Sequence, residues 1–318
     1  MELDELAMYT ALALEARRLL IKELLDKEVR IRANMRNIVK EIAKEIKANP
    51  NMLERIEDHL RNKEEIIRES LRKEIDSGLK LSIEAGMHES RETTLSILNK
   101  ADINWKPIER SYFRVHNEAV DYMYERNIKG LNLSDRIWAN SWRVRYSLGE
   151  IIEEAIREGL NPTDIAELLE RYANDGAKTF AVQYPNMFER LTVPMDMNYE
   201  SLRLARTEMA AAFGHASVES AKINPSTQGI KWSISNAGVT CDVCLEISEK
   251  DNGMGKGVYE VDKLPDYPAH PNCLCVLSEV TENIDDLVDR LVEWNKNPLS
   301  QPDLERWYQN IYKLGEVS

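Results

Sequence analysis

Apolar residues recur at three- and four-residue spacing through most of the first hundred residues, and this period constrains the fold more than any other feature. In the first stretch, residues 3–47, the apolar period is interrupted once, where Lys27 and Glu28 occupy the expected apolar position. Asn49-Pro50-Asn51 ends that stretch, because a proline interrupts the hydrogen bonding of a helix, and a second stretch covers about 52–98. Two long helices joined by a short turn predict an antiparallel hairpin that buries little core of its own.

Further helices follow, and most of them have a recognisable start. Lys106-Pro107 begins one, and the capping sequences at Asn132 and Asn161 precede two more. Another covers about 199–222, where a run of alanine and glycine allows close backbone packing. Between them, residues 184–198 hold two prolines and show no period, so we expect a linker or an extended crossing there.

After residue 223 the sequence pattern changes from long helical segments to short strand-like runs. Short strand-like runs stand at 229–235, 258–261 and 274–277, and two helices of about 283–294 and 303–314 close the chain. The expected fold is a mainly α N-terminal region with long helices, followed by a small α+β C-terminal domain. The expected domains are a long helical hairpin over 1–100, a second helical domain over 101–222, and an α+β lobe with C-terminal helices over 223–318.

All four cysteines of the chain lie close together, as Cys241-x2-Cys244 and, 25 residues later, His270-x2-Cys273-x-Cys275. Such clustering favours metal binding over a spread of disulfides, and Zn²⁺ prefers four thiolate or imidazole ligands in a tetrahedron. Cys241, Cys244 and Cys273 are the surest ligands, and His270 and Cys275 compete for the fourth place. In a strand, Cys273 and Cys275 would point to the same face. We therefore expect a structural Zn²⁺ that stabilises the C-terminal domain.

Charge and hydropathy exclude other classes of protein. The net charge is −13, and residues 241–318 hold 7 Lys/Arg against 16 Asp/Glu, or −9, which disfavours a DNA-binding zinc module. A basic stripe on the first helix is expected to be a solvated face, because acidic residues stand beside it. No apolar run is long enough for a membrane-spanning helix, and the N-terminus lacks the pattern of a signal peptide. The stripe consists of Arg30, Arg32, Arg36 and Lys40.

Several motifs occur in a fixed order in the second half of the chain. Arg206-Thr207-Glu208 on a helix is followed by Trp232 in a strand-like run, then by the CxxC pair and by the HPNCLC element at 270–275. This order resembles the phage Mu F-like head morphogenesis family over roughly residues 130–280. Leu274 stands where that family usually has an arginine, and the gap between the two cysteine motifs is long and glycine-rich.

The resemblance implies a minor head protein that lies in the virion, inside the capsid near the portal, and in the host cytoplasm during assembly. It implies the portal protein as partner, with the major capsid or scaffolding protein and packaged DNA as further candidates, and a role in head assembly and DNA packaging or ejection. We expect no enzyme, since five donors saturate zinc. The alternative is a zinc-dependent hydrolase or nucleic-acid-processing enzyme with Glu246 or Asp242 as general base. Against it, Pro271 and Asn272 follow His270, without the H-x-E pattern of deaminases.

Overall fold

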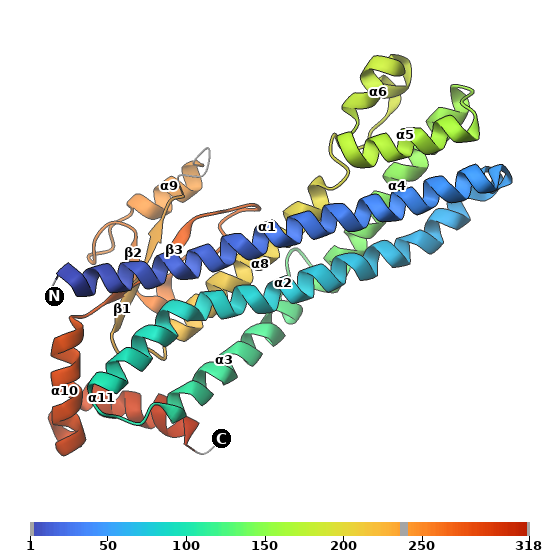
Figure 1. Cartoon of the computed structure of the whole chain (residues 1–318). Helices are drawn as coiled ribbons and strands as arrows, with labels where there is room; N and C mark the ends of the chain where they lie inside the picture. The colour runs from blue at the N-terminus through green and yellow to red at the C-terminus, as the bar shows by residue number, and fades with distance from the viewer. Residues whose placement is uncertain (1–2, 236–240, 317–318) are drawn as a thin grey trace. The chain divides into compact units, whose positions relative to one another are not determined.

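The computed structural model describes residues 3–235 and 241–316 and is mainly helical, with a small three-stranded antiparallel sheet near the C-terminus (Figure 1). Helices thus fill the first part of the chain, and strands enter only after residue 226. The expected order of a long helical region followed by a smaller α+β part is confirmed at this level.

The first hundred residues form two long helices, α1 (Leu3–Ala48) and α2 (Ile56–Lys100), joined by the short 3-10 turn η1 (Pro50–Arg55) (Figure 1). Proline begins the turn, as its fixed φ and missing N–H predict. The two helices run antiparallel, since Glu45 near the end of α1 pairs with His59 near the start of α2. Lys27, further back along α1, pairs with Glu74, further along α2.

The interruption of the apolar period of α1 at Lys27 is explained by the packing of α1 against α2. The side chain of Lys27 occupies a core position of the helix pair with only 6% of its surface exposed. Its ammonium lies 3.5 Å from the equally buried carboxylate of Glu74, which also accepts a hydrogen bond from Asn34 at 3.4 Å. A buried ion pair therefore replaces an apolar contact at this level of the hairpin.

One compact unit consists of Leu24–Gly78 and Tyr124–Arg206. Asn132 and Asp135 form a reciprocal capping box at the start of its longest later helix, α4, and Asn161 caps the next, α5. The aperiodic segment 184–198 was expected to be a linker or an extended crossing, and this is wrong for its first part, which forms a short helix. Pro185 stands in the first turn of a helix, a position where its missing N–H costs nothing. The helices of this unit are α4 (Leu133–Arg157), α5 (Pro162–Asp175), α6 (Lys178–Gln183) and α7 (Pro185–Arg190).

The other compact unit consists of Met1–Glu23, Leu79–Met123 and Thr207–Ser318. It contains most of α3 (Lys106–Glu125) and of α8 (Tyr199–Ala221), together with the sheet and the C-terminal helices. The expected close packing along the Ala/Gly run of α8 is confirmed, because a Cβ on Gly214 would lie 2.1 Å from the Tyr267 ring. The C-terminal helices are α9 (Asp242–Glu249), α10 (Ile284–Lys296) and α11 (Pro302–Trp307), followed by a short π turn (Tyr308–Tyr312) and the 3-10 turn η5 (Lys313–Gly315).

The sheet has the order β2-β1-β3, with β1 (Thr227–Ser233) between β2 (Val258–Tyr259) and β3 (Val276–Thr281). Both neighbours pair antiparallel with β1, and Trp232 lies opposite Leu277. The third strand was expected at 274–277, and this is wrong. It begins two residues later and continues to Thr281, because the residues before Val276 form the turn that carries the second cysteine motif.

Each compact unit takes residues from more than one of the expected domains. The division into domains over 1–100, 101–222 and 223–318 stays a prediction.

Candidate metal centre

The first cysteine motif stands at the N-terminus of α9. Cys241 is the N-cap residue, and its sulfur accepts a hydrogen bond from the backbone N–H of Cys244 at 3.3 Å. The two side chains therefore lie on the first turn of a helix, where free N–H groups and the helix dipole favour a thiolate. The CxxC pair thus lies at the start of a helix.

The second motif forms a compact turn that ends before β3. The N–H of Cys273 donates to the carbonyl of His270 at 3.1 Å, and Asn272 has a φ of 60°, in the left-handed region that asparagine tolerates. Cys273 and Cys275 thus lie outside the strand, and the strand geometry expected for them is wrong. Both sulfurs nevertheless reach the same cluster, because the turn brings them there.

The five predicted donors lie together as two groups that share one residue. The donor atoms of Cys241, Cys244 and His270 lie within 4.8 Å of one another, and so do those of Cys244, Cys273 and Cys275. Two thiolates bound to one tetrahedral zinc at about 2.3 Å lie about 3.8 Å apart. The sulfurs of Cys244 and Cys273 are 3.7 Å apart, so this pair already has the spacing of zinc ligands.

His270 is oriented for ligation by its own turn. Its Nδ1 lies 2.9 Å from the carbonyl oxygen of Pro271, so a proton on Nδ1 leaves the Nε2 lone pair free. Nε2 lies 3.1 Å from the sulfur of Cys244. A hydrogen bond from the second imidazole nitrogen is the usual way in which proteins orient a metal-binding histidine. This contact favours His270 for the fourth place, although the sulfur of Cys275 also lies within 4.8 Å of that of Cys244.

The electrostatics of the cluster are unfavourable without a cation. Burial raises the pKa of Cys244 to about 12. A hydrogen bond with Cys275 raises the pKa of Cys273 further above its usual range, and the same contact lowers the pKa of Cys275. Buried thiolates at this spacing repel one another, and this repulsion favours protons on Cys244 and Cys273. A divalent cation would reverse this balance and displace those protons.

The surroundings of the cluster are apolar on one side and accessible on the other. Cys244, Cys273 and Cys275 are buried in a small core with Trp232 and Leu277 of the sheet. Cys241 and His270 are only partly buried. Glu246 and Asp242, the carboxylates of the enzyme hypothesis, are exposed on α9.

Three contacts that the sequence did not indicate hold the second turn in place. Arg17 of α1 is buried and donates to the carbonyl of Leu274 at 2.5 Å, and Tyr267 donates to the carbonyl of Cys275 at 2.8 Å. No local sequence pattern predicts the contact between Arg17 and Leu274, because the two residues are 257 positions apart. The backbone N–H of Asn272 donates to the hydroxyl of Thr207 at 3.2 Å, which joins this turn to the Arg-Thr-Glu helix.

Several of the remaining charged candidates have ion-pair partners. Arg206 of the Arg-Thr-Glu motif pairs with Glu28 of α1. In the basic stripe, Arg30 pairs with Asp26 and Arg32 with Asp196, which agrees with a solvated helix face.

The fold and the cluster define a mainly helical protein with a candidate Cys/His metal centre in its small β-containing part. No protein family, no curated protein and no solved structure matches this chain. Among the described residues, no helix combines the length and the apolar composition needed to cross a membrane.

Proposed function

We propose that the chain is a minor head protein of a phage, of the Mu F-like kind, which binds the portal and acts in head assembly and in DNA packaging or ejection. The observation that supports this proposal is the convergence of the motifs that carry the resemblance. Thr207 of the Arg-Thr-Glu helix contacts Asn272 of the HPNCLC turn, and Trp232 packs in the same small core as Cys244 and Cys273. These segments lie far apart in the sequence.

In this proposal the metal is Zn²⁺ and its role is structural. Five donors suffice to close a tetrahedral site, and the sheet beside them has three short strands with a thin core. Small lobes of this kind gain much of their stability from a metal. The proposed place of the protein is inside the capsid near the portal, with the host cytoplasm as the site of assembly.

The portal-binding surface is proposed to lie on the helical hairpin. Leu25 and Val29 stand one turn apart on α1 and keep 58% and 67% of their surface exposed. Aliphatic side chains at this spacing form an apolar strip, as expected of a helix that packs on a partner. Deleting residues 1–100 would remove buried residues of both compact units, so point variants are the sharper test.

The experiment is co-purification of the full chain with a tagged phage portal protein. We expect the tagged portal to retain the wild-type chain and to lose a Leu25→Glu, Val29→Glu variant. The control is Leu299→Glu, a change at another exposed aliphatic residue that lies outside the hairpin. Retention of the hairpin variant would place the surface elsewhere, and absence of the wild-type chain would contradict the proposed function.

The second candidate is a zinc-dependent hydrolase or nucleic-acid-processing enzyme. The partial exposure of Cys241 and His270 supports it, since substrate would have to approach from that edge. A Glu246→Gln variant separates the two candidates. An enzyme would lose hydrolysis of single-stranded DNA or RNA while it keeps its fold and metal, whereas a structural centre would show no metal-dependent hydrolysis in either form.

A further inference from the structure

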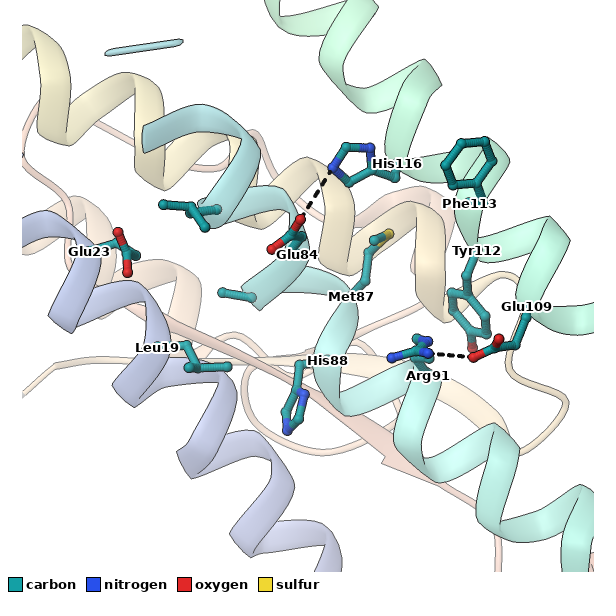
Figure 2. Close-up of a pocket in the computed structure, with 12 residues that line it drawn as sticks. Leu19, Glu23, Glu84, Met87, His88, Arg91, Glu109, Tyr112, Phe113 and His116 are labelled. Carbon is teal, nitrogen blue, oxygen red and sulfur yellow. Dashed lines mark hydrogen bonds and ion pairs between the residues drawn. The ribbon is translucent and has the colours of Figure 1, made fainter. Parts of the chain in front are cut away.

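A groove of about 530 Å³ lies within the unit that contains the sheet, between α1 and α3 and above α2 (Figure 2). Leu19 and Glu23 line it from α1, and Phe113 and His116 line it from α3, with Met87 of α2 between the two walls. All the residues that line the groove lie on these three helices. It is separate from the cysteine cluster, which lies among other residues.

Apolar side chains line this groove, although it is open to solvent. Phe113 keeps 69% of its surface exposed, and Leu19 and Leu81 are also among the exposed large apolar residues. The lining residues of α2 extend from Leu81 to Arg91. At about 1.5 Å per residue this is a length of about 15 Å, or about three helical turns. A single small side chain would leave most of such a groove uncovered.

The charges of the groove are mainly negative. Its lining has three carboxylates and one guanidinium, a net charge of −2 with both imidazoles neutral. Glu109 and Arg91 pair with each other (Figure 2). Glu84 is well exposed, and its carboxylate lies 3.9 Å from Nε2 of His116. Within the described part of the chain, Glu23 has no ion-pair or hydrogen-bond partner.

We propose that this groove binds a cationic amphipathic helix of a partner protein. A helix satisfies its own backbone hydrogen bonds, so it can lie in an apolar channel without leaving polar groups unpaired. Its aliphatic face would cover Leu19, Leu81 and Phe113, and lysine or arginine beside that face would reach the carboxylates of Glu23 and Glu84. The same carboxylates repel nucleic-acid phosphates and anionic lipid surfaces. This inference does not depend on the portal, because any partner with such a helix fits the groove.

The test is a selection from a displayed library of 18-residue helical peptides. Each peptide carries leucine at positions i, i+4, i+7 and i+11, and the positions beside this stripe are randomised between lysine and glutamate. Selection against the immobilised full-length chain should enrich lysine at these positions. Phe113→Ser should weaken the selected peptides at least tenfold, and Glu23→Lys with Glu84→Lys should reverse the preference to glutamate.

Two matched controls keep the outcome specific to the groove. Leu299→Ser removes an exposed aliphatic residue elsewhere, and Glu153→Lys with Glu167→Lys makes the same charge change on exposed residues of α4 and α5. Neither should alter the selection. Failure to select any peptide, enrichment of glutamate, or equal binding by the groove and control variants would overturn the proposal. A dimer in sedimentation that Phe113→Ser dissociates would also overturn it, because a second copy would then occupy the groove.

Discussion

Replacing Cys244 should weaken metal binding far more than replacing Cys275. Cys244 belongs to both groups of donors, so its loss leaves neither group complete. A structural zinc site contributes about 10–16 kcal/mol of binding free energy, or roughly 2.5–4 kcal/mol for each of four ligands. Cys244→Ser should therefore lower the zinc affinity by roughly 10²–10³-fold, at about 1.4 kcal/mol for each tenfold change. Cys275→Ser leaves the group of Cys241, Cys244 and His270 complete, with the sulfur of Cys273 still 3.7 Å from that of Cys244, and should stay within about tenfold of the wild type.

The assay is competition with a chromophoric chelator on protein purified under reducing conditions without chelator, and zinc content should be about one equivalent per chain. The dependence on pH checks the mechanism. Because burial raises the pKa of Cys244 to about 12, this thiol carries a proton at neutral pH that zinc must displace. Affinity should thus fall as pH falls, by about tenfold per pH unit for each displaced proton.

Three results would refute this reasoning. Less than about a tenth of an equivalent of zinc would show that the cluster consists of packed thiols or disulfides. Equal affinities of the Cys244→Ser and Cys275→Ser variants would show that Cys244 is not shared. If His270→Ala binds zinc as the wild type does while Cys275→Ser loses it, then Cys275 is the fourth ligand. Circular dichroism of each variant with and without zinc separates loss of ligation from loss of fold.

Three further predictions concern stability. Lys27→Met should lower the free energy of unfolding in urea by about 3–5 kcal/mol, because it leaves the carboxylate of Glu74 buried without its ion-pair partner. Adding Glu74→Leu should recover most of this loss. Equal losses in the single and double variants would contradict the role of the pair. Gly257→Ala should cost about 1–3 kcal/mol more than Gly253→Ala in thermal unfolding, since both residues have positive φ but only at Gly257 would a Cβ meet backbone oxygens, at 2.7 Å. Asn132→Ala should cost about 1 kcal/mol through loss of the cap of α4, whereas Asn132→Asp should keep the cap and serves as the control.

Local interactions explain which parts of the fold could be predicted from the sequence. The limits of α1 and α2 follow from the apolar period and from Pro50, and the starts of α4 and α5 follow from Asn132 and Asn161. Each of these signals acts within four residues along the chain, through helical hydrogen bonds or a side chain that caps them. The prediction for residues 184–198 was wrong because the same residue type can have two opposite effects on a helix. A proline such as Pro185 both interrupts and begins helices.

The candidate metal site likewise has features that the local sequence indicates and features that only the tertiary structure shows. The types and spacing of the five donors are local features of the sequence, and by themselves they indicate a metal site. Only the tertiary structure places Cys244 in both donor groups, brings Arg17 to the carbonyl of Leu274, and buries Lys27 against Glu74. These contacts join residues that are 29, 257 and 47 positions apart. Their geometry depends on how whole helices and the sheet pack, and no periodicity within one segment records that packing.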